Sequence, residues 1–250
     1  MLKRPLTIYV DESGSPVFGQ PKVGEWPQGY VPCAVAIPEL LRPALEGLIP
    51  RSADGTLLKS SSLELSDERL ASFLDRALQT RIEVALVLID ASSQVNASRA
   101  AEVTELSNER RRLRGNPRTK TPHLIYTLAT RNAIIAAWTR ASSAMGSPIG
   151  YLDIVLDEQA IPTHARRLYV EIFENEWRGK GLADPHVTWQ SSGTEPLLHV
   201  PDLFASVYRR QAARHDVPRS FAILEGALGA GRISVNDEFT TPGKRPETED

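Results

Sequence analysis

The chain has 250 residues, of which 41% are hydrophobic and 24% are charged, with a formal net charge of −2. This composition is typical of a soluble globular protein, excludes a disordered or fibrous chain, and provides no general electrostatic attraction to nucleic acid. The single cysteine excludes an internal disulfide framework and a cysteine-rich zinc site. There is no 18-residue apolar stretch and no signal peptide, so we expect a cytoplasmic protein without membrane association.

The first predicted element is a strand that ends in two carboxylates. Strand-forming residues from Leu6 to Val10 lead into Asp11 and Glu12, and a turn of Ser, Gly and Pro follows. Alternation along a strand places Asp11 on the face of Tyr9 and Glu12 on the opposite face. A rigid strand ending in a turn can hold a chemical group at a site. An aspartate here can equally accept hydrogen bonds from the turn amides. The strand alone leaves both explanations open.

The next elements alternate between strands and helices. Residues 17–29 are rich in Gly and Pro and read as a hairpin or loop, and residues 30–37 form a second strand. A short helix over 39–48 and a helix of about four turns capped by Ser66 follow. The most apolar strand, residues 81–90, ends in Asp90. Lys59 lies in an extended segment between the helices, where it is either a solvated charge or a site residue.

Residues 92–121 are predicted to be a basic insertion or loop. Six cations fall within its second half: Arg110, Arg111, Arg112, Arg114, Arg118 and Lys120. Gly115 and Pro117 break a helix, and no acid in this window can pair with the cations. A solvated loop and a phosphate-binding segment therefore both remain open.

The second half of the chain continues the alternation. It predicts a helix over 123–144, a strand over 149–158 that ends in Asp157, a helix over 162–178, a strand over 186–190, and a helix that starts at Pro201 with Asp202 in its first turn. Residues 1–234 are thus predicted to form one elaborated α/β domain with a mixed sheet. Residues 235–250, rich in Pro, Thr, Asp and Glu, are predicted to be a disordered tail.

Four aspartates stand at the ends of these elements: Asp11, Asp90, Asp157 and Asp202. Strands that end at one edge of a sheet bring their last residues together, and carboxylates brought together repel unless a cation joins them. Mg²⁺ and Mn²⁺ prefer such oxygen ligands, and two such ions can hydrolyse phosphodiester bonds. Each acid also has an ordinary structural explanation, since Asp202 could satisfy a helix N-terminus and Asp157 could begin a turn.

Four segments carry a further signal through their order along the chain: the strand into Asp11-Glu12-Ser13-Gly14, Leu58-Lys59-Ser60-Ser61, Leu156-Asp157-Glu158, and Leu198-His199-Val200-Pro201-Asp202-Leu203. In this order they resemble a bacterial family, domain of unknown function 3800. The resemblance spans about residues 5–215 and implies a ribonuclease H-like fold with an acidic, metal-dependent nuclease centre. The chain departs from the family pattern at His199 and Pro201, where the family usually has glutamine and alanine.

The resemblance implies which residues form the centre. Asp11, Glu12, Asp157 and Asp202 are the expected catalytic residues. Asp11, Asp157 and Asp202 are the expected ligands of Mg²⁺ or Mn²⁺, with Asp90 in reserve. Lys59 and the six cations of residues 110–120 are expected to contact RNA or DNA phosphates. At the family level, the resemblance suggests a role in defence or as a toxin. The alternative is an inactive ribonuclease H-like scaffold that binds nucleic acid or a partner protein, and a homodimer is compatible with either.

Overall fold

The computed structural model describes residues 4–15, 29–90, 94–146, 149–158, 166–178, 185–211 and 218–236. The strands are β1 (Arg4–Ser13), β2 (Gly29–Pro38), β3 (Glu83–Val87), β4 (Ile89–Asp90), β5 (Ile149–Asp157), β6 (His186–Gln190) and β7 (Ile233–Asn236). The helices are α1 (Arg42–Glu46), α2 (Asp67–Gln79), α3 (Gln94–Leu113), α4 (Thr121–Met145), α5 (Arg166–Arg178), α6 (His199–Gln211) and α7 (Arg219–Gly229), with 3-10 turns at Glu39–Leu41 and Pro196–Leu198. Within these residues, we find no helix that is both long and apolar enough to cross a membrane.

The strands form one mixed sheet in the order β6-β5-β1-β2-β3-β7, and β4 pairs with the start of β2. β2 runs antiparallel to both β1 and β3, whereas β5 runs parallel to β1, β6 to β5, and β7 to β3. The fold is therefore α/β with a mixed sheet, as the alternation of predicted elements indicated. β1, β3, β5 and β6 all point the same way, so their last residues meet at one edge of the sheet.

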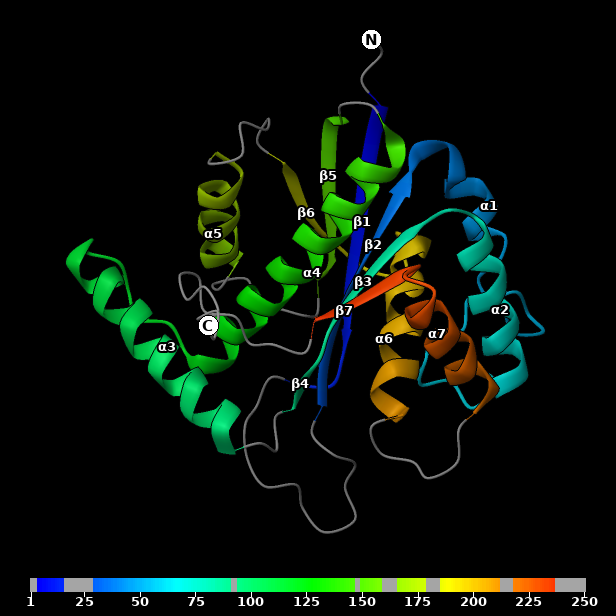
Figure 1. Ribbon diagram of the computed structural model, residues 1–250, viewed down its shortest axis with the longest axis horizontal. Helices are drawn as coiled ribbons and strands as arrows, with labels where there is room; N and C mark the ends of the chain where they lie inside the picture. The colour runs from blue at the N-terminus through cyan, green and yellow to red at the C-terminus, as the bar shows by residue number, and fades with distance from the viewer. Residues whose placement is uncertain are drawn as a thin grey trace, which may run out of the picture.

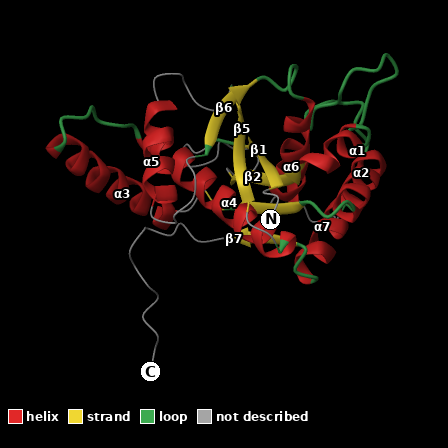
Figure 2. Ribbon diagram, turned by 90° about the horizontal axis from the view of Figure 1, so that it is seen from above, coloured by secondary structure: helices red, strands yellow, loops and turns green. Residues whose placement is uncertain are grey.

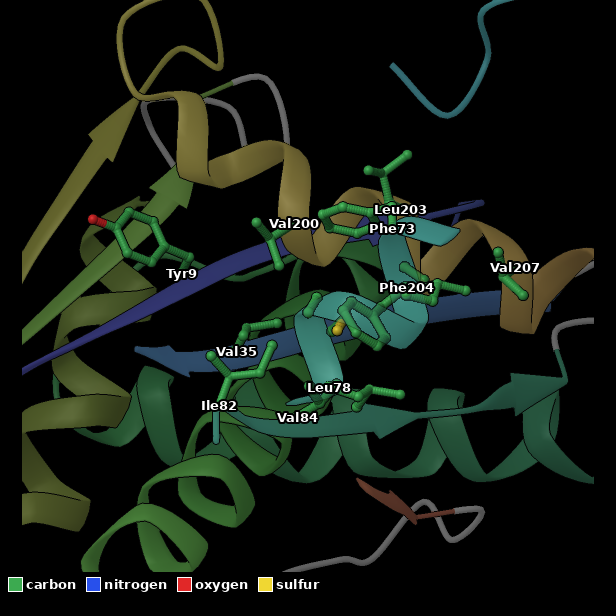
Figure 3. Close-up of a cluster of buried hydrophobic side chains, with 14 of the residues drawn as sticks. Tyr9, Val35, Phe73, Leu78, Ile82, Val84, Val200, Leu203, Phe204 and Val207 are labelled. Carbon is green, nitrogen blue, oxygen red and sulfur yellow. The ribbon is translucent and has the colours of Figure 1, made fainter. Parts of the chain in front are cut away.

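Helices cover both faces of this sheet (Figures 1 and 2). Alternation along β1 sends Tyr9 to one face, where it packs with residues of α2, α6 and α7. Ile8 and Val10 point to the other face and pack against α4 and α5. Figure 3 shows the first of these cores, with Val200 and Leu203 of α6 beside the buried strands. Since a strand buried on both sides is rigidly held, the end of β1 is a fixed point of the molecule.

The turn after β1 depends on a glycine. Gly14 has a φ of +95°, a backbone conformation that residues with a side chain rarely adopt. A Cβ atom added there would overlap the carbonyl oxygen of Gly29 and crowd Arg209 of α6. The absence of a side chain therefore lets the end of β1, the start of β2 and helix α6 come close together.

Several predicted elements need correction. The basic insertion is mainly a helix, because α3 occupies residues 94–113, and only residues 114–120 form a connection. The tail predicted from residue 235 begins with the last residues of β7, which pairs with β3. The predicted strand 81–90 is two strands, β3 and β4, separated at Leu88. The predicted loop 17–29 ends inside β2, and its residues 17–28 lie outside the described residues, as do 237–250 of the tail.

Candidate functional site

A pocket of about 210 Å³ lies at the edge of the sheet where β1 and β5 end. The residues that line it come from β1, the segment after α1, β5, the segment before α6, and α6 itself. They are Asp11, Glu12, Lys59, Ser60, Ser61, Asp157, Ser192, His199 and Asp202. The four acids expected to form a catalytic centre are thus all among the lining residues, and so is Lys59.

Parallel pairing of β1 with β5 explains why two of the acids meet. Val10 is in register with Leu156, so Asp11 and Asp157 follow side by side at the ends of neighbouring strands. Asp157 has only 7% of its surface exposed. Asp11 is partly buried, and its Oδ1 accepts a hydrogen bond from the backbone N–H of Glu12 at 2.8 Å. This is the turn-stabilising role considered for Asp11, and it leaves the other carboxylate oxygen of Asp11 available to the pocket.

Glu12 lines the same pocket although alternation places it on the opposite face of β1. On that face, burial raises the pKa of Tyr30 and Tyr126, and the negative charge of Glu12 raises it further. The position of Glu12 explains why it lines the pocket and also affects the opposite face. Asp11 is level with Asp157, the last residue of β5, so Glu12 lies one residue past the end of β5. Because β5 does not run beside Glu12, the Glu12 carboxylate can reach Asp157, and the expectation that Glu12 points away from Asp11 is wrong at this edge.

Asp202 joins the pocket from the first turn of α6, where the helix dipole favours an anion. Both oxygens of its carboxylate are engaged by Ser60. The backbone N–H of Ser60 donates to Oδ2 at 2.9 Å, and its hydroxyl donates to Oδ1 at 2.6 Å. The guanidinium of Arg210, two turns along the same helix, donates to the carbonyl oxygen of Ser60. These bonds attach the Lys59–Ser61 segment to α6 and keep it beside the carboxylates.

Burial and crowding disfavour negative charge in the pocket. Burial raises the pKa of Asp11 well above its usual range, and the charges of Glu12, Asp202 and Asp157 raise it further. Burial also raises the pKa of Glu12, to about 8, with Asp157 and Asp202 as the charged contributors. Carboxylates with such values hold a proton near neutral pH or bind a cation in its place.

Sequence reasoning missed four lining residues: Ser60, Ser61, Ser192 and His199. The serines carry no signal of their own, because serine is common in exposed turns. His199 can be recognised in the sequence by its spacing from Asp202. It stands three residues before Asp202, which is the spacing that puts two side chains on one face of a helix.

His199 is buried, with 4% of its surface exposed. Its ring lies against the backbone of Leu58 and Ser192. Burial lowers the pKa of His199, the charge of Asp202 raises it and that of Lys59 lowers it. The ring is therefore biased towards its uncharged form.

Asp90, the expected reserve ligand, does not line the pocket. It is exposed on β4, opposite Gly29 at the start of β2. β4 continues β3 along β2 in the same register, so β2 lies between Asp90 and the end of β1. The placement corrects the expectation that Asp90 shares a site with Asp11.

The basic residues 110–120 do not line the pocket either. Arg110, Arg111 and Arg112 form part of the last turn of α3, and Arg114 and Arg118 follow it. Helix α3 projects from the body of the molecule in Figure 1. Arg111 forms an ion pair with Glu171 of α5 at 3.1 Å, and Arg118 pairs with Glu105 of α3 at 2.6 Å. Both partners lie outside the sequence window, which contains no acid of its own. Contact of these cations with phosphate stays a prediction.

No family model matches the chain and no curated protein matches it, so the resemblance to domain of unknown function 3800 stays a prediction.

Proposed function

We propose that this chain is a divalent-metal-dependent nuclease that hydrolyses phosphodiester bonds in RNA or DNA. One observation carries the proposal: Asp11, Glu12, Asp157 and Asp202 line a single pocket, and crowding with burial raises the pKa of Asp11 and Glu12. A fold gains no stability from crowding buried carboxylates, so such a cluster is a functional-site candidate.

We further propose that the sheet is ribonuclease H-like. Supporting this is the order of its central strands, in which the antiparallel set β3-β2-β1 is extended by β5 and β6 parallel to β1. The expected acids also lie at the ends of these elements: Asp11 is near the end of β1, Asp157 ends β5, and Asp202 is in the first turn of the helix that packs on β1. The family resemblance implied the same residues in the same order.

The residues of the pocket fit a hard divalent cation by their chemistry. Asp11, Asp157 and Asp202 would hold Mg²⁺ or Mn²⁺, with Glu12 beside them, because these ions prefer carboxylate oxygens. Within the described ranges, no three His, Cys, Asp or Glu side chains are already arranged to hold an ion. Each oxygen of an ionised carboxylate has a second lone pair, so the bonds from Ser60 orient Asp202 and still leave it able to bind an ion.

The bound ion would activate water and stabilise the oxygen that leaves the phosphate. The chain's own residues supply the remaining functions. The ammonium group of Lys59, which is exposed and lines the pocket, provides a positive charge for a phosphate oxygen. The carboxylate of Glu12 lines the same space beside the other acids and can accept a proton from the attacking water. The hydroxyls of Ser61 and Ser192 line the same space and can donate hydrogen bonds to the substrate.

Cleavage assays test this proposal directly. Full-length protein is incubated with end-labelled single- and double-stranded RNA and DNA in Mg²⁺, in Mn²⁺ and in EDTA. We expect cleavage only with the ions, and a loss of about 100-fold or more in Asp11→Asn, because a catalytic ion contributes several kcal/mol to the transition state. Asp90→Asn is the matched control, since it removes the same charge outside the pocket and should leave the rate unchanged. Cleavage that survives EDTA or Asp11→Asn would falsify the metal-site mechanism.

A second candidate function is a ribonuclease H-like scaffold that binds nucleic acid or a partner protein without cutting. The observation that favours it is that, within the described ranges, no three His, Cys, Asp or Glu side chains are already arranged to hold an ion. Binding to any of the four nucleic acids, without cleavage under any ion condition, would support the scaffold and reject the nuclease.

A further inference from the structure

His199 is the one nitrogen-bearing aromatic group among the described residues that line the pocket. Its side chain comes from the first residue of α6 and is almost fully buried, with 4% exposed. Its Nδ1 atom is buried and makes no hydrogen bond of normal geometry to the described part of the chain, although the backbone of Leu58 and Ser192 lies close to the ring. A buried polar atom without a well-formed bond costs stability, so a ligand in the pocket that bonds to it would be favoured.

The helix places His199 next to a proposed metal ligand. His199 and Asp202 are three residues apart in α6, so both side chains leave the same face of the helix, and both line the pocket. A carboxylate and an imidazole at this spacing on one helix are a common source of two ligands to one ion. Burial also favours the uncharged ring, which is the form that binds a metal.

We propose that His199 supplies a nitrogen ligand to the ion held by this pocket, which therefore prefers a first-row transition-metal ion to Mg²⁺. This inference rests on the proposed metal site. Mg²⁺ binds carboxylates and water and dehydrates reluctantly, whereas imidazole suits transition metals. A nitrogen donor beside Asp11, Asp157 and Asp202 thus shifts the selectivity of the site away from Mg²⁺.

Pulsed electron paramagnetic resonance on the Mn²⁺-loaded full chain tests the proposal without any activity measurement. A coordinated imidazole gives a ¹⁴N hyperfine coupling to Mn²⁺, and protein labelled with ¹⁵N-histidine should replace it with a ¹⁵N coupling. His199→Gln should remove the coupling and weaken Mn²⁺ binding by about tenfold or more, as loss of groups around a metal does. Mg²⁺ affinity should change much less. His186→Gln is the matched control, because His186 is exposed on β6 and bonds to Asp153 at 3.1 Å.

The outcomes separate the two proposals. Mn²⁺ binding that needs Asp11 but shows no histidine coupling overturns the role of His199 and leaves the proposed metal site standing. Absence of Mn²⁺ binding by the wild-type chain overturns both. A coupling retained in His199→Gln but lost in His186→Gln also overturns the assignment. If His199→Gln fails to fold, the isotope replacement in the wild-type chain still decides whether a histidine binds the ion.

Discussion

The fold treats two groups of charged residues differently: it gathers the acids of the pocket and separates the cations of residues 110–120. The acids of the pocket are scattered along the sequence, yet the sheet and α6 bring them to one place. The cations of residues 110–120 are adjacent in sequence, yet Arg111 turns to Glu171 of α5 and Arg118 to Glu105 of α3. The comparison teaches that the packing of a buried strand fixes the position of a charge at its end. The charges of an exposed run are not held in one place by packing, and each can pair with a different nearby acid.

The largest expected difference between the acidic pocket and the α3 region is in how the free energy of unfolding depends on pH. Because the folded pKa of Glu12 is raised from 4.5 to about 8, the folded chain holds a proton that the unfolded chain releases across that range. Stability is therefore lost as the pH rises. Without divalent ions, we expect the free energy of unfolding to fall by on the order of 3 kcal/mol between about pH 5 and pH 8.

Urea denaturation at a series of pH values measures this fall. Glu12→Gln should remove most of it, because an amide does not titrate. Glu105→Gln, which alters an exposed acid of the α3 region, should leave it in place. A fall in Glu12→Gln as steep as in the wild type would show that Glu12 is not the group that holds the proton.

A smaller effect is expected from the segment that bonds to Asp202. Ser60→Ala removes the hydroxyl that donates to Oδ1 at 2.6 Å. A hydrogen bond to a charged group contributes about 1.5–3 kcal/mol, and the backbone N–H of Ser60 keeps a second bond, so we expect a loss of about 1–2 kcal/mol in urea denaturation. Ser61→Ala, at the exposed neighbouring position of the same pocket, should change stability by less than about 0.5 kcal/mol. Equal losses in the two variants would mean that Asp202 is not held by Ser60.

The smallest expected effect is on the salt dependence of nucleic-acid binding. Lys59→Ala should lower the slope of log affinity against log salt by about 1, because Lys59 lines the pocket. Combined replacement of Arg110, Arg112 and Arg114 by alanine should lower the slope by about 2 or more, because these exposed cations at and just after the end of α3 are predicted to contact phosphate. An unchanged slope in the triple variant would show that these cations are solvated and do not contact nucleic acid.

The sequence predicted the parts of the fold in which local pattern and packing agree. β1 and β5 are apolar strands that carry Asp11 near the end of β1 and Asp157 at the end of β5, and α2 begins after Ser66, whose hydroxyl accepts the N–H of Arg69. The acids of the pocket were predictable because each one ends or begins such an element. The lining serines were not, because Ser60 is placed by its bonds to the distant Asp202.

Helix α3 was missed for a physical reason. Its buried positions, Ala100, Thr104 and Asn108, recur every four residues, but only one of the three is apolar. Hydrophobic periodicity therefore gives no helical signal there, and the arginines that follow suggest a loop. Helix α7 is similar, because its buried stripe of Ser220, Leu224 and Ala227 is interrupted in sequence by glycines that suggest a break.

The pairing of β1 with β5 has a consequence for the order of events during folding. Strand β1 is synthesised early, but its parallel partner in register with Val10 is reached only at Leu156, and Asp202 comes later still. Pairing across so many residues closes a long loop and is slow compared with local structure formation. Asp11 and Asp157 can meet once β5 pairs with β1, but the set of carboxylates is complete only when α6 has been synthesised and has docked.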